Sequence, residues 1–147
     1  MTWLLHLHGI LALVALYFGY RLRKALLDGA ESGPRGAARA HALGLAASVA
    51  AVFVTGVVLY ARYREPGGVR TWLLAHAPTW HEVWFEWKEH LGFFSLALAI
   101  GLWMAARHAP GAPRTALAYP LLVTLLLTFI VTTIVGTVLS FFVKTVA

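Results

Sequence analysis

Four long apolar runs constrain this chain more than any other feature of its sequence. They cover residues 3–20, 42–60, 91–106 and about 117–143, and basic or acidic residues flank them. Each run approaches the roughly 20 residues that a helix needs to cross a ~30 Å hydrocarbon core. Backbone groups inside a bilayer must be satisfied within each span, so we expect helices and not strands. The sequence therefore predicts an all-α integral membrane protein, a bundle of four transmembrane helices.

The chain is predicted to form a single transmembrane domain. Its spans are expected at about residues 3–22, 41–62, 84–107 and 116–143. The third span is extended back to residue 84, which places residues 87–90 at the membrane interface. Tryptophans and the apolar pair Leu73 and Leu74 in the connection before it predict a short helix lying on the membrane surface.

Composition supports a membrane location and argues against nucleic acid as a partner. Only 12% of residues are charged, where a soluble domain usually carries about 25%. The net charge of +6 is best explained by the basic residues that mark the cytoplasmic side of a membrane protein. Seven of the twelve basic residues lie in the first and third connections and five lie on the other side. We therefore predict that both termini are outside.

Histidine is the residue that carries chemical information in this chain. There is no cysteine, which excludes thiolate metal sites, disulfides and cysteine nucleophiles. Histidine inside a hydrophobic span is costly and calls for an explanation. His8 and His90 are predicted near the outer ends of the first and third spans. His41 and His108 are predicted near the inner ends of the second and third.

Helical spacing relates these histidines to small residues. His90 and His108 are 18 residues apart, which is five turns, so both project from one face about 27 Å apart. Gly101 lies on that face, where a small residue would let a flat macrocycle or another helix approach. His6 and His8 are about 200° apart on a helix. We choose His8 because its face carries small residues, and His6 stays an alternative.

Two imidazoles from facing helices are suitable axial ligands for a haem iron. Pairing by depth gives His8 with His90 outside and His41 with His108 inside. A simpler explanation is that these rings lie at headgroup depth, and that His108 is a cation at a helix C-terminus.

Three short motifs resemble those of small four-helix b-type cytochromes, broadly cytochrome b561-like proteins. The matching segments are LHLHG (5–9), RAHALG (39–44) and EHLGF (89–93). Members of this family use bis-histidine haems on opposite sides of the bilayer. The resemblance therefore implies one or two b haems, held by His8, His41, His90 and His108, in a bacterial-type inner membrane. The last span departs from the pattern because it has no histidine.

Two other segments are distinctive. The last span carries a stripe of hydroxyl residues, for which we predict bonds back to helix carbonyls or across to a neighbour. The stripe comprises Thr124, Thr128, Thr132, Thr133, Thr137 and Ser140. The connection before the third span is either an aromatic belt, a lid over a quinone or a docking face, where His76, His81 and Glu82 would exchange protons. All six acidic residues are predicted to lie in loops or at the ends of spans, which disfavours an ion-coupled transporter.

Three functions are compatible with these patterns. The first, which we favour, is a b-type cytochrome that carries electrons across or within the bilayer and exchanges them with quinone or another redox protein. The second is an accessory or anchor subunit of a larger respiratory or photosynthetic membrane complex. The third is a haem-handling or copper-handling membrane enzyme. Four spans form a small bundle around two haems, so we also predict a homodimer or a subunit of a larger membrane complex.

Overall fold

The computed structural model describes residues 2–28, 35–108 and 112–146, with side chains for residues 3–28, 36–107 and 116–138. The described part consists of helices and short turns, without strands. In chain order the elements are α1 (Thr2–Asp28), α2 (Arg35–Tyr63), α3 (Val69–His76), the π-helical turn η1 (Trp80–Phe85), α4 (Glu86–His108) and α5 (Ala112–Val146).

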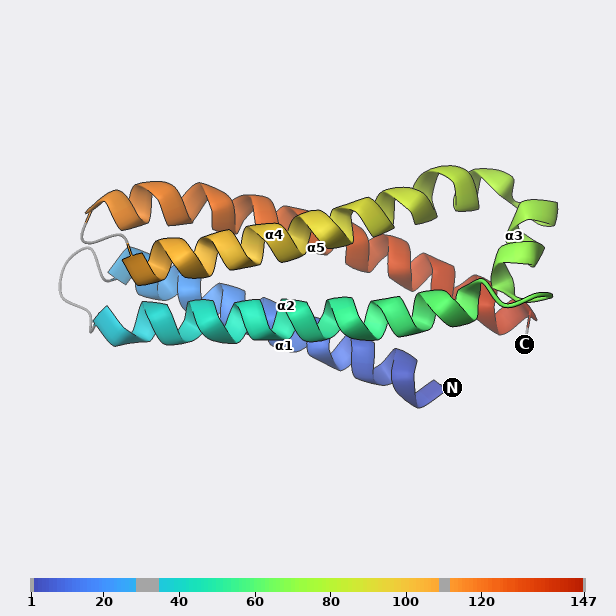
Figure 1. Ribbon diagram of the computed structural model, residues 1–147, viewed down its shortest axis with the longest axis horizontal. Helices are drawn as coiled ribbons and strands as arrows, with labels where there is room; N and C mark the ends of the chain where they lie inside the picture. Colours follow the sequence, from blue (N-terminus) through green and yellow to red (C-terminus); the bar gives the residue numbers. More distant parts are fainter. Residues whose placement is uncertain (1, 29–34, 109–111, 147) are drawn as a thin grey trace.

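Four long helices run along the length of the molecule, and the short helix α3 lies at one end (Figure 1). Both chain termini are at the end that carries α3, which we call the termini end. The opposite end, where α1 is followed by α2 and α4 by α5, is called the loop end (Figure 1). This alternation is what four successive spans require, because each span reverses the direction of the chain.

The predicted four-helix membrane bundle is confirmed. Four helical segments are long and apolar enough to cross a membrane, so this is a multi-pass membrane protein. These segments are Trp3–Asp28, Gly36–Tyr63, Trp80–Arg107 and Ala116–Val138.

The first two helices are longer at the loop end than their apolar runs. Helix α1 continues to Asp28, six residues beyond its predicted end, and α2 begins at Arg35. Arginine, lysine, leucine and alanine are good helix formers. Leu26, in this extension, is buried one turn after the fully buried Leu22, so tertiary packing also favours helix there. The first charged residues beyond an apolar run thus mark the expected edge of the membrane and not the end of the helix.

Each long helix has two principal neighbours. Helix α1 packs on α2 and α5, and α4 packs on the same two helices. Helices α1 and α4 therefore occupy diagonal positions in the bundle. This arrangement decides which predicted histidines can meet.

The apolar core lies mainly towards the loop end. It is built from small and branched apolar side chains of all four long helices. Alanines next to leucines and valines let these helices pack closely. Its largest fully buried members are Leu22, Leu45, Leu102, Leu122 and Leu125. A second, smaller cluster joins α3 and η1 to the termini end through Tyr63, Leu73, Phe85 and Val135. Polar side chains occupy the region between the two clusters.

Candidate functional site

His8 of α1 points towards α2, where it meets a threonine. Its Nδ1 lies 2.9 Å from Oγ1 of Thr55. The Thr55 hydroxyl itself lies 2.9 Å from the carbonyl oxygen of Ala51 and 3.0 Å from that of Val52. A hydroxyl has one proton, and here the helix carbonyls accept it, so Oγ1 accepts a hydrogen bond from His8. With its proton on a helix carbonyl, Thr55 pairs with the tautomer of His8 that carries the ring proton on Nδ1.

A glycine makes room for this imidazole. A Cβ atom on Gly56 would lie 3.4 Å from Cε1 of His8, tighter than ordinary contact. Ala15 and Gly19, which share the His8 face of α1, are buried. A Cβ on Gly19 would lie 2.8 Å from Leu126 of α5 and 4.0 Å from Leu45 of α2, so the small-residue face that begins at His8 is turned into the bundle.

Lys88 of α4 lies within range of an electrostatic interaction with His8. Its Cε atom lies 3.2 Å from the position that a Cβ on Gly136 of α5 would occupy. Its ammonium nitrogen is 5.8 Å from the centre of the Phe85 ring, a distance at which cation and ring attract. The lysine stem therefore runs along the inside of the bundle, between α4 and α5.

Residues 87–90 were predicted to lie at the membrane interface, and among them the stem of Lys88 is directed into the bundle. The span that contains Lys88 begins at Trp80, because η1 continues directly into α4 without a break. This start is four residues earlier than predicted, so Lys88 lies inside the span. A cationic side chain within a transmembrane segment is expensive and marks a candidate functional site.

His90 projects from the outer side of α4. Its ring is exposed, and its Nδ1 donates a hydrogen bond of 2.8 Å to the Glu86 carbonyl of its own helix. The face that continues from it is also exposed, with Phe94 at 48% and Met104 at 51%. No atom lies within 4 Å of a Cβ built on Gly101. The stripe that was expected to face a macrocycle in the bundle therefore faces outward in a single chain.

His41 lies at the loop end and is half-buried. Its ring is tilted against Phe18 of α1, with centroids 6.4 Å apart, and its charge interacts with that of Arg21. Helix α4 ends at His108, whose side chain lies outside the described residues.

The described part of the chain does not bring a pair of predicted haem ligands face to face. His8 and His90 are on the diagonal helices α1 and α4 and point in different directions. Considered one at a time, His8 and His90 each fit the role of an axial ligand. The Nδ1 atom of His8 is paired with Thr55 and that of His90 with the Glu86 carbonyl, which leaves Nε2 for a metal. No three histidine, aspartate or glutamate side chains among the described residues gather as a metal site. The haem pairs stay predictions.

A second polar cluster lies at the termini end, beneath α3. The Tyr63 hydroxyl and His81 Nδ1 are 2.9 Å apart in a buried hydrogen bond. Tyr63 also stacks on Phe85, with ring centroids 3.9 Å apart. Glu89 lies near the Tyr60 side chain, and its Oε1 is buried without a hydrogen-bond partner among the described residues. His81, predicted to exchange protons at the surface, is thus buried and holds η1 against α2.

Replacing Tyr63 with phenylalanine is expected to loosen this end of the bundle. The change keeps the stacked ring and removes the bond to His81, which costs about 1 kcal/mol, or more because both groups are buried. Hydrogen exchange should become faster in residues 69–85. A matched control is Tyr17→Phe, which removes only an exposed bond to Arg21. Unchanged exchange in Tyr63→Phe would show that the bond does not anchor η1.

The hydroxyl stripe of α5 is structural, as predicted. Thr124, Thr128 and Thr137 donate hydrogen bonds to carbonyls one turn earlier. Thr132 and Thr133 both donate to the carbonyl of Phe129. The side chain of Ser140 lies outside the described residues. These hydroxyls are satisfied by their own helix.

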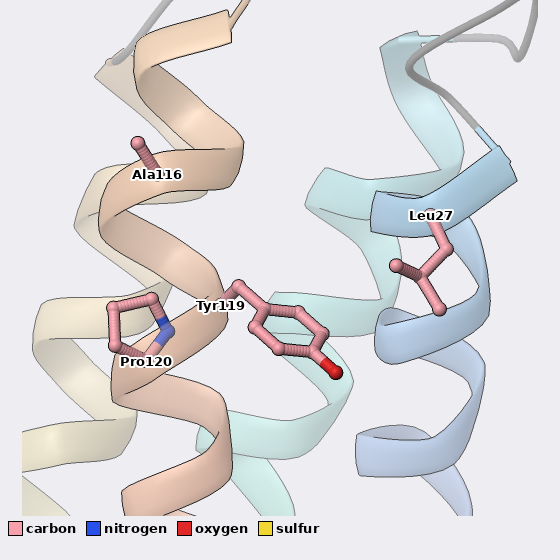
Figure 2. Close-up of a pocket in the computed structure, with 4 residues that line it drawn as sticks. All are labelled: Leu27, Ala116, Tyr119 and Pro120. Carbon is pink, nitrogen blue, oxygen red and sulfur yellow. The ribbon is translucent and has the colours of Figure 1, made fainter.

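A pocket at the loop end contains none of the histidines. Figure 2 shows the residues that line it, Leu27 of α1 and Ala116, Tyr119 and Pro120 of α5, with the Tyr119 ring directed from α5 towards α1. The lining is largely apolar. Its chemistry suits a hydrocarbon chain and not an ionic or metal ligand.

Sequence reasoning found His8 and did not find its partners. Neither Thr55 nor Gly56 was predicted to contact His8, and Lys88 was placed at the interface. The available signal was the series Trp80, Trp84 and Trp87, which precedes Lys88 and continues the third span towards the N-terminus. No family model, curated protein or solved structure matches this chain.

Proposed function

We propose that the protein is a membrane b-type cytochrome that carries electrons through histidine-ligated haem and exchanges them with quinone. The observation that supports it best is His90. Its Nδ1–H donates to the Glu86 carbonyl, which leaves Nε2 free to bind iron, and metal-bound histidines commonly donate their other ring N–H to a carbonyl in this way. The haem would supply reversible one-electron chemistry, and the protein would orient the imidazole.

The second imidazole at this haem comes from another copy of the chain. His8, at the same end, points into its own bundle. Two chains that cross the membrane in the same direction, related by a twofold axis along the membrane normal, place their His90 residues at equal depth. Ala97 and Gly101 follow on the same exposed face of α4, and such small residues let two helices approach.

The proposed setting is a bacterial-type inner membrane with both termini outside. The basic residues flanking the spans support this orientation, with seven of the twelve at the loop end, four at the termini end, and Lys88 within the third span. The haem at His90 and the polar group around His8 would then both lie in the outer half of the membrane.

Haem counting combined with sizing tests this proposal. The purified chain should contain b haem by pyridine haemochrome assay, and the haem should travel with a dimer and not with a monomer. Haem bound to monomers would contradict the shared site. A colourless protein, purified without loss of haem, would contradict the cytochrome proposal and favour an accessory subunit.

A further inference from the structure

The pocket at the loop end is separate from the haem proposed at His90, which lies at the opposite end of the bundle. It lies between α1 and α5, has a volume of about 320 Å³ and opens to the surface of the bundle (Figure 2). Ligand pockets usually occupy ~300–1,000 Å³. This pocket therefore has room for a segment of one hydrocarbon chain and not for a large ring system.

Short side chains on α5 create this space. Deeper in the bundle α1 and α5 are in tight contact, because a Cβ on Gly19 would lie 2.8 Å from Cδ2 of Leu126. About two turns further along α1, Leu27 faces Ala116 and Pro120. Alanine and proline do not extend as far from the helix as leucine does. The two helices therefore leave an apolar opening near the loop end.

An exposed arginine lies beside this opening. Gly19, Arg23 and Leu27 follow one another at intervals of four residues, so they form one stripe along α1. The first and the last of them face α5. Arg23 is exposed and makes no ion pair with a described residue. A long basic side chain of this kind extends over apolar surface and keeps its charged end in the headgroup region.

The charge at the loop end favours an anionic headgroup. The two connections at this end and the helix turns beside them contain seven basic residues and two acidic ones, Asp28 and Glu31. Basic residues clustered beside a membrane attract anionic lipids, and each lysine or arginine adds to the attraction. A zwitterionic headgroup would bring a cation of its own to this basic surface.

We propose that the pocket binds one acyl chain of an anionic phospholipid whose phosphate is bound by Arg23. The apolar lining suits the chain, and a peptide segment is a poorer match because its backbone amides would lack partners there. With both termini outside, as proposed above, the loop end faces the cytoplasmic leaflet, where anionic lipids are located. The site is independent of bound haem.

Native mass spectrometry of the full chain in detergent tests the site. The probes are dioleoyl phosphatidylglycerol and dioleoyl phosphatidylcholine, which have the same acyl chains and differ in headgroup charge. Phosphatidylglycerol should bind more tightly. Ala116→Phe places a ring in the pocket and should lower the affinity for phosphatidylglycerol about fivefold or more, as the contacts of the chain are lost. The matched control is Leu117→Phe, because Leu117 is exposed and does not line the pocket.

Arg23→Gln tests the contact to the headgroup. The change keeps a long polar side chain and removes the charge, so the affinity for phosphatidylglycerol should fall about fivefold. The affinity for phosphatidylcholine should stay the same. Arg107→Gln is the control at the same end, because the Arg107 guanidinium lies 5.5 Å from the centre of the Trp103 ring on its own helix.

Three results would overturn the proposal. Equal affinity of the wild type for the two lipids would rule out the preference for an anionic headgroup. Wild-type binding of phosphatidylglycerol by Ala116→Phe would show that the lipid is attracted by surface charge without using the pocket. Equal losses in Arg23→Gln and Arg107→Gln would show that no single arginine binds the phosphate. Ala116 and Arg23 are both exposed, so the fold should be intact in these variants, as thermal unfolding would verify.

Discussion

Replacing His90 with alanine is expected to remove the haem proposed for the termini end, which amounts to one haem for every two chains. The change deletes the only nitrogen that each copy offers to the shared iron, so the loss should be complete. Pyridine haemochrome counts on wild type and variant measure it. The matched control is His76→Ala, because His76 is also exposed and its Nδ1 is also bonded to a carbonyl of its own helix.

The companion variant His8→Ala distinguishes a haem shared by the His90 residues of two chains from a haem held by His8 and His90 of one chain, as predicted from the sequence. It should keep the haem that His90→Ala loses, because His8 lies inside the bundle against Thr55. Full retention of haem in His90→Ala would contradict the assignment. Any haem that remains in His90→Ala belongs to another site, for which His41 and His108 are the predicted ligands.

Replacing Leu102 with alanine should lower the free energy of unfolding by about 2–5 kcal/mol. Leu102 is completely buried in the core of the loop end, so its loss leaves a cavity between closely packed helices. Unfolding in mild detergent, followed by circular dichroism, gives the measurement. Ile100→Ala is the control on the same helix, since Ile100 is 45% exposed. Equal destabilisation by both variants would show that the core is not packed as described.

The four spans were predictable because their signal is physical and strong. A bilayer requires long apolar helices, and the sequence has four runs of that kind. The hydroxyl stripe of α5 was equally accessible, since threonine in an apolar helix has its own carbonyls within reach. Helix ends were less accurate. The extension of α1 to Asp28 depends on the burial of Leu26, which only the assembled core reveals.

The orientation of α4 is what sequence reasoning missed. Helical period shows that His90 and Gly101 share a face, but it does not show whether that face meets a neighbour or lies outside. In a membrane both sides of a helix are apolar, so hydrophobicity does not separate them. The interior position of Lys88 depends on the space left by Gly136, on a different helix. The match between a long side chain on α4 and a glycine on α5 appears only when the helices are assembled.

A dithionite-reduced minus oxidised visible spectrum of the purified protein tests the central claim most directly. A b-type cytochrome with two imidazole ligands gives a sharp α-band, and our account predicts that band in the dimeric wild type. Its absence from a protein purified without loss of haem would contradict the account and leave His90 as an interfacial side chain.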